Sequence, residues 1–240
     1  MGMSPPVAAL VRKELREYRH HRSILLTALG LPVVFLFLPV LYLAGFDTEH
    51  ANASRAVGQA MFTFFLTPVI VPAAMAAYSV IGEKEHGTLE PVLTLPLTDR
   101  QFIHAKLIAI VAPATMISIV VYGGYYALGS LFFREPVRSP ALEPGWAFGV
   151  VLMSAPLALY STLLGMNISA RAKDLRVAEQ LAGMIILPTL VPISLVTFQV
   201  LPLGLATWGG FLALVLLFDL FLLRLAYRTF QRERVLALAA

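Results

Sequence analysis

The chain has 240 residues, of which 58% are hydrophobic and 13% charged, with a mean hydropathy of +0.79. A soluble domain has about 45–50% apolar and about 25% charged residues, so this composition excludes an ordinary soluble protein and predicts an integral membrane protein. Cysteine is absent, which excludes disulfides, thiolate metal sites and a cysteine nucleophile. In a soluble protein, a pI near 9.5 would suggest nucleic-acid binding. Here we attribute it to basic residues placed at the bilayer surface, and we expect no nucleic-acid partner.

The first segment, SPPVAALVRKELREYRHHR, precedes the first apolar run. Ser4 is a suitable N-cap and Pro5 is tolerated in a first helical turn, so we predict a helix over 4–21. One stripe of this helix is apolar and consists of Val7, Leu10, Val11, Leu15 and Tyr18. The basic residues lie largely off that stripe and are Arg12, Lys13, Arg16 and Arg19. This pattern predicts an amphipathic helix in the cytoplasmic interface of the membrane, and the alternative is a positively charged anchor with no further role.

Six apolar runs follow, each long enough to cross a hydrocarbon core of about 30 Å, which needs roughly 20 helical residues. We predict spans at 23–45, 57–81, 103–133, 146–169, 181–200 and 208–227. The third would be about 46 Å long as a helix, so it must tilt, kink near Gly123 and Gly124, or project into water. There is no internal repeat or long linker, and we predict one all-α polytopic membrane domain over 1–240.

Lysine and arginine are distributed unequally between the two sides of these spans. The N-terminal segment, the second and fourth loops and the C-terminal end carry 15 of the 18. The opposite side carries Arg55, Arg134 and Arg138. Because basic residues are enriched in cytoplasmic loops, this bias predicts that both termini face the cytoplasm. We expect a multi-pass protein of the cell inner (plasma) membrane.

The second loop and its flanks, GEKEHGTLEPVLTLPLTDRQFIHAK at 82–106, place many titratable residues between two apolar runs. Gly87 can end the preceding helix, and Thr88 can cap a short new helix in which Pro91 lies within the tolerated first turn. Thr98 and Gln101 form a capping-box pattern that predicts the start of the third span. The sequence therefore predicts a short helix within 83–97.

This short helix would have one apolar face formed by Leu89, Val92 and Leu93. Such a face either packs against the helix ends of the same chain and lipid, or docks on a second protein. The sequence pattern alone leaves both alternatives open.

One charge lies inside a predicted span, Asp219 in LALVLLFDLFLLRLAYR. An intramembrane carboxylate is a candidate functional group. Arg224 is five residues away, which is a poor spacing for a pair on one helical face. We favour a structural ion pair with another helix, and a role in substrate or proton binding is the alternative.

The second loop resembles the loop between the second and third spans in permeases of the type-2 ATP-binding-cassette (ABC) exporter family. The shared features are an acidic-basic-acidic run, Gly-Thr, a hydrophobic residue, Glu, a short hydrophobic stretch, Pro and a later Lys. The resemblance extends to the basic N-terminus, the six-span layout and the fourth loop, SARAKDLRVAEQLAGMIILP. The segment QVLPLGLATW between the last two spans is short, so we expect no elaborate extracellular gate there.

The resemblance implies a membrane subunit that dimerises with a second copy or a similar chain in the lipid bilayer. It also implies a cytoplasmic ABC ATPase subunit docked on the N-terminal helix and on a coupling helix in the second loop. The residues carried over to this coupling segment are Glu83, Glu85, Gly87, Thr88, Leu89, Glu90, Val92 and Leu93. The implied function is that of an exporter permease that forms the substrate path and is driven by ATP hydrolysis in the separate subunit.

Catalytic motifs are absent from the sequence. It contains no G-x-x-x-x-G-K-[ST] phosphate loop and no H-E-x-x-H motif, so we expect no enzymatic activity, metal or cofactor in this chain. ATP and Mg²⁺ would bind to the partner subunit. The alternative function is a non-ABC six-helix secondary transporter or a membrane scaffold that depends on Asp219.

Overall fold

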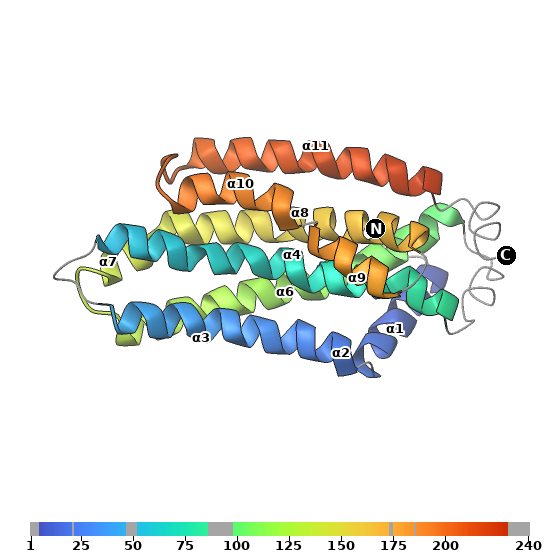
Figure 1. The fold of residues 1–240 in the computed structure, drawn as a ribbon, viewed down its shortest axis with the longest axis horizontal. Helices are drawn as coiled ribbons and strands as arrows, with labels where there is room; N and C mark the ends of the chain where they lie inside the picture. Colours follow the sequence, from blue (N-terminus) through green and yellow to red (C-terminus); the bar gives the residue numbers. More distant parts are fainter. Residues whose placement is uncertain are drawn as a thin grey trace.

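The computed structural model describes residues 5–20, 22–46, 52–85, 98–172, 175–184 and 186–229. These residues form helices joined by short turns, with no strand among them, which confirms the predicted all-α class. The helices α3, α4, α6, α8, α10 and α11 lie along the long axis of the molecule, as Figure 1 shows. The short helix α7 lies at one end of this bundle, and α1 lies at the other end.

The first predicted span is built from three helical pieces. Their bounds are Arg22–Leu25 for α2, Leu26–Gly30 for the π-helical turn η1 and Leu31–Ala44 for α3. Pro32 lies in the first turn of α3. Proline lacks an N–H and its ring crowds the carbonyl four residues earlier, and the wider π turn before it accommodates this.

The remaining helices have the bounds Pro5–His20 for α1, Ala53–Glu85 for α4, Asp99–Phe132 for α6, Arg138–Ala141 for α7, Pro144–Arg171 for α8, Leu175–Met184 for α9, Ile186–Thr197 for α10 and Leu205–Thr229 for α11. The helix α8 lies at the centre of the bundle, where it packs against α4, α6 and α11. The helix α6 is continuous through Gly123 and Gly124 and spans about 51 Å at 1.5 Å per residue.

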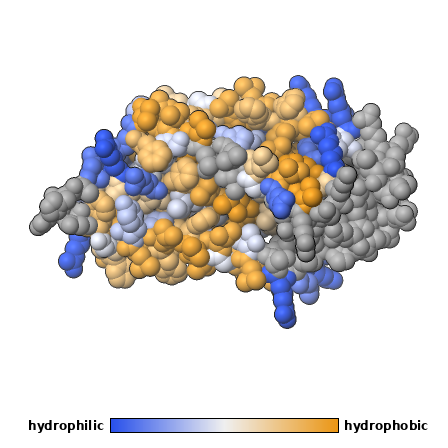
Figure 2. Space-filling view, in the orientation of Figure 1, coloured by the Kyte–Doolittle hydropathy of each residue, from blue (hydrophilic) through white to orange (hydrophobic). Residues whose placement is uncertain are grey.

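Five helical stretches of the described residues are long and apolar enough to cross a membrane: Leu26–Ala44, Ala53–Ala76, Asp99–Phe132, Arg138–Arg171 and Leu205–Thr229. A broad band of hydrophobic residues covers the middle of the molecule between hydrophilic ends (Figure 2). These features establish a multi-pass membrane protein. The predicted fifth span, 181–200, contains the end of α9 and the 12-residue α10, about 18 Å of helix, so the count of six spans stays a prediction.

Small residues allow the helices to approach closely. A Cβ atom on Gly58 of α4 would collide with the backbone carbonyl of Thr197 at the end of α10. A Cβ on Gly149 of α8 would collide with the indole of Trp208 in α11. Ser161 of α8 donates a hydrogen bond of 2.5 Å to the backbone carbonyl of Val69 in α4. Membrane helices associate through close packing and hydrogen bonds of this kind, because lipid offers no hydrophobic driving force between them.

Candidate functional site

The helix α1 packs against the start of α6 through a buried stripe. Val7, Leu10, Val11 and Tyr18 belong to this stripe, as the helical spacing predicts. The prediction was wrong for Leu15, which is 37% exposed, whereas Glu14 is 1% exposed and takes its place. Positions 7, 11, 14 and 18 are separated by three or four residues and therefore share one helical face.

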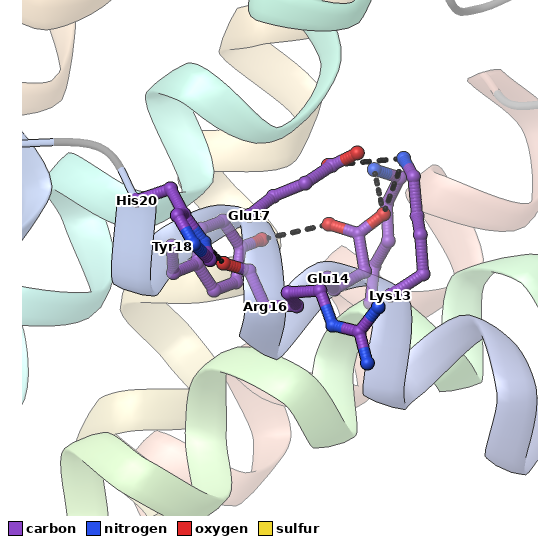
Figure 3. A network of polar contacts seen from close by, with 7 residues as sticks. Lys13, Glu14, Arg16, Glu17, Tyr18 and His20 are labelled. Carbon is purple, nitrogen blue, oxygen red and sulfur yellow. Dashed lines mark hydrogen bonds and ion pairs between the residues drawn. The ribbon is translucent and has the colours of Figure 1, made fainter.

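The carboxylate of Glu14 is held by three side chains. Lys106 Nζ donates to Glu14 Oε1 at 3.1 Å, and the Tyr18 hydroxyl donates to Glu14 Oε2 at 3.0 Å. Lys13 Nζ lies 3.6 Å from Glu14 Oε1 and 3.0 Å from Glu17 Oε2. Figure 3 shows the Glu14 carboxylate between the Tyr18 hydroxyl and the lysine amines. The pair between Glu14 and Lys106 joins two helices that are 92 residues apart in the chain.

Burial and charge act in opposite directions on Glu14. Burial favours the neutral acid, but Lys106, then Lys13, and the hydrogen bonds from Lys106 and Tyr18 stabilise the carboxylate, and the net effect lowers the pKa of Glu14 below its usual value. Lys106 itself is fully buried, and its Nζ lies 5.2 Å from the ring centroid of Phe102. The two opposite charges therefore compensate each other in the interior, as buried ions require.

The predicted capping box is present at the start of α6. Thr98 Oγ1 accepts from the Gln101 backbone N–H at 3.3 Å, and Gln101 Oε1 accepts from the Thr98 backbone N–H at 2.9 Å. The helix consequently begins at Asp99, four residues before the predicted start of the span. Lys106 lies two turns further along α6, so the contact with α1 is close to the point where the second loop enters the helix.

Most of the predicted coupling segment lies outside the described residues. This applies to Gly87, Thr88, Leu89, Glu90, Val92 and Leu93. The backbone of Glu83 and Glu85 belongs to the last turns of α4. The structure therefore describes the two ends between which the segment runs, α4 and the capped start of α6.

The basic residues of α1 lie on its outer side. Arg12, Arg16 and Arg19 are exposed, and Lys13 is half-buried where it pairs with Glu17 and Glu14. The predicted separation of an apolar stripe and a basic face therefore exists in α1. Whether that face lies in the membrane interface stays a prediction.

Asp219 of α11 is 3% exposed, and its carboxylate lies close enough to Tyr160 of α8 to act on it electrostatically. Neither of its carboxylate oxygens has a hydrogen-bond partner, and among the described residues no basic group lies within ion-pair distance of it. The ion pair that the sequence favoured is therefore not formed within the described part of the chain. Asn167 of α8 hydrogen-bonds the Leu163 carbonyl at 2.8 Å through Nδ2, and its Oδ1 is also without a partner.

A cavity of about 70 Å³ lies between α4, α8, α10 and α11. Its walls are mainly apolar and include Phe65, Tyr160, Pro192 and Trp208. A volume of this size holds only a few water molecules. In the described part of the chain, no group of three or more His, Asp or Glu residues is placed to hold a metal ion.

The role of Glu14 was not predicted from the sequence, and Lys106 was predicted only as one of the basic residues of the second loop and as the later Lys of the family pattern. One signal could have identified Glu14: it continues the spacing of Val7, Val11 and Tyr18 on the apolar stripe, where an isolated charge requires a partner. The identity of that partner, 92 residues away, follows only from the packing of α1 on α6.

The fold and this site define a class: a helical multi-pass membrane protein whose N-terminal helix is held on a long span beside an inter-span loop. The family model of the ABC-2 family transporter protein matches residues 8–210. The chain therefore belongs to the ABC-2 family and is a membrane permease component of an ABC transporter. No curated protein matches the chain in a sequence comparison.

Proposed function

We propose that the chain is the permease subunit of an ABC exporter and that a separate cytoplasmic ATPase subunit drives it. In this proposal the ATPase binds ATP and Mg²⁺ and docks on the coupling segment within 83–97 and on α1. The permease acts as a dimer, with a second copy or a similar chain, in the inner membrane with both termini in the cytoplasm. Membership of the ABC-2 family favours this function over a secondary transporter or a scaffold dependent on Asp219.

The buried pair of Glu14 and Lys106 is the observation that carries the proposal. A partner that moves either α1 or the coupling segment acts on α6, because α1 is bound to α6 by this pair and the segment leads directly into the capped start of α6. Separating the pair would leave two uncompensated charges in a buried environment, which is costly. A displacement of α1 therefore moves the 34-residue helix α6 with it, because the pair keeps the two helices together.

The small internal cavity supports a substrate path between two permease subunits. At about 70 Å³, the cavity between α4, α8, α10 and α11 is far below the roughly 300–1,000 Å³ of typical ligand sites. A path at the interface of two chains does not require this packed interior to open.

The test is affinity purification of the tagged chain from its native host in mild detergent. The wild type is compared with the double variant Glu85→Arg, Leu89→Asp, which reverses a charge and places a carboxylate on the predicted apolar face. We expect an ATPase with a phosphate loop to copurify with the wild type and to be lost from the variant.

The matched control is Glu143→Arg, Val200→Asp, which makes the same two chemical changes at exposed positions at the opposite end of the bundle (Figure 1). It should retain the ATPase. Elution volume in size-exclusion chromatography and the Tm establish that each variant is folded. The proposed docking on this segment is wrong if a folded Glu85→Arg, Leu89→Asp variant still copurifies with the ATPase, or if no ATPase copurifies with the wild type.

A further inference from the structure

A second group of basic residues lies where the start of α6 meets the end of α11. Asp99, Arg100, Arg224, Tyr227 and Arg228 line a hollow of about 400 Å³ between these two helices. Its size is within the range of small-ligand sites. It belongs to the end of the bundle at which α6 begins and α11 ends, where the apolar band gives way to hydrophilic residues (Figures 1 and 2).

Tyr227 holds the two helices together at this hollow. Its hydroxyl forms a hydrogen bond of 2.7 Å with His104 Nε2, a contact between residues 123 positions apart. The guanidinium carbon of Arg100 lies 5.6 Å from the centroid of the Tyr227 ring, within the range of a cation–π contact. These two contacts restrain Arg100 of α6 beside Arg224 and Arg228 of α11.

The charge of the hollow suits an anion. Among the described residues, three guanidinium groups and one carboxylate, that of Asp99, line the hollow, and His104 lies nearby on Tyr227. Within the described residues, Arg100, Arg224 and Arg228 make no ion pair with a carboxylate. Guanidinium groups present a planar fork of donors that matches phosphate oxygens. Arg224 and Arg228 also complement the dipole at the end of α11, but this role does not account for Arg100 on the other helix.

An exposed apolar stripe leads from the hollow along α11. Leu217, Leu220 and Phe221 precede Arg224 by seven, four and three residues, so they share its helical face. They are 66%, 55% and 63% exposed, respectively. The same face therefore offers a basic group at the membrane surface and an apolar surface inside the hydrocarbon region, an arrangement that matches an amphiphile better than a free anion.

We propose that this hollow binds an anionic phospholipid, with its phosphate on Arg100, Arg224 and Arg228 and an acyl chain along Leu217, Leu220 and Phe221. Basic pockets between membrane helices recognise anionic lipid head groups in this way. The site is separate from the coupling segment, and the proposal does not depend on an ATPase partner.

Native mass spectrometry of the detergent-purified chain, titrated with phosphatidylglycerol or with phosphatidylcholine, tests the proposal. The wild type should bind the first phosphatidylglycerol at least about tenfold more tightly than phosphatidylcholine. The variant Arg100→Gln, Arg224→Gln, Arg228→Gln should lose at least about tenfold of the phosphatidylglycerol affinity, since each basic group near a membrane surface contributes on the order of 1 kcal/mol and 1.4 kcal/mol is tenfold. Asp99→Asn should strengthen this binding, because it removes the opposing charge.

The matched control is Arg55→Gln, Arg134→Gln, Arg138→Gln, which removes the same charge from exposed positions at the other end of the bundle, at the start of α4 and beside α7 (Figure 1). It should leave the first phosphatidylglycerol affinity within about twofold of the wild type. An equal loss in both triple variants, or no preference for phosphatidylglycerol, overturns the site.

Inorganic phosphate is the third probe, and displacement of the lipid by an equal concentration of phosphate overturns the assignment to a lipid. The Tm without lipid verifies folding, and if the triple variant is unfolded the three single Gln variants replace it.

Discussion

At the scale of single residues, the pair of Glu14 and Lys106 shows how a charge can belong to a helix face that is otherwise apolar. Glu14 is 1% exposed, yet three side chains satisfy its carboxylate. A buried ion pair contributes little net stability compared with apolar residues of similar size. Removal of one partner, however, leaves the other charge buried without compensation. The pair therefore specifies where α1 sits on α6 more than it stabilises the fold.

Removal of one charge from this pair should destabilise the protein. We expect Lys106→Met to cost about 3–5 kcal/mol, because it leaves the Glu14 carboxylate buried without its main partner. The double variant Glu14→Leu, Lys106→Met should recover most of this loss, since it removes both charges. Thermal unfolding of the purified variants in one detergent measures the order of Tm values. A double variant less stable than Lys106→Met would contradict the compensation between the two charges.

The lowered pKa of Glu14 predicts a dependence of stability on acid. A carboxyl group with a lower pKa in the folded state binds fewer protons there than in the unfolded state, so the free energy of unfolding rises with pH. Glu14 makes its full contribution to the free energy of unfolding above its usual pKa of 4.5. This contribution is lost as the pH falls through the lower pKa that Glu14 has in the folded state. The Tm of the wild type should therefore fall more steeply than that of Glu14→Gln below about pH 4.5. Parallel Tm curves from pH 6 to pH 3 would contradict this.

At the scale of helices, close approach depends on glycines at particular crossings. Gly58 permits contact between α4 and α10, and Gly149 accommodates the Trp208 indole between α8 and α11. Trp208 is 1% exposed, stacks on Phe65 at 5.1 Å and donates a hydrogen bond of 3.1 Å to the Gly145 carbonyl. These crossings, rather than helix propensity, decide which helices are neighbours.

Gly58→Ala should lower the Tm although alanine is the better helix former. The added Cβ would meet the Thr197 backbone carbonyl, which cannot rotate away as a side chain could, so α4 and α10 must move apart. Gly123→Ala is the matched control, because a Cβ there has no neighbour within 4 Å and alanine favours a helix by about 1 kcal/mol over glycine. The Tm of both variants in the same detergent tests this. A Gly58→Ala protein as stable as Gly123→Ala would show that this crossing is not tight.

At the scale of the whole molecule, the apolar band and the hydrophilic ends define how the bundle lies in a membrane (Figure 2). Seven basic residues of α1, α6 and α11 lie at the end of the bundle that carries α1. They are Arg12, Lys13, Arg16, Arg19, Arg100, Arg224 and Arg228. Arg134 and Arg138 lie at the other end, near α7. This distribution supports the proposed cytoplasmic location of α1, since basic residues are retained on that side.

The natural absence of cysteine allows the topology to be tested directly. We expect a membrane-impermeant maleimide to label Ser139→Cys and Val200→Cys in intact cells, and to label Arg16→Cys only after the membrane is opened. Labelling of Val200→Cys from outside requires six spans, because residues 172–200 must then cross the membrane once. If Val200→Cys is protected from the maleimide in intact cells while Ser139→Cys is labelled, the chain has five spans and its C-terminal end lies outside.

The sequence alone determined the class of the protein. Long apolar runs and few charges predicted an all-α membrane domain, because a lipid environment requires helices with internally satisfied backbones. The Thr98–Gln101 capping box was predictable for a similar reason, since both partners lie within one turn of the chain. The loop at 82–106 also indicated the ABC family, to which the chain belongs.

Only the tertiary structure decided which distant residues meet. The partner of Glu14, the contact of Arg100 and His104 with Tyr227, and the glycine crossings at Thr197 and Trp208 join segments far apart in the chain. Hydropathy and helical periodicity report which face of a helix is buried, but they carry no information about the helix that covers it. That choice depends on the shapes and charges of two surfaces together, which is why the contact of α1 with α6 and the basic hollow beside α11 are seen only in the packed bundle.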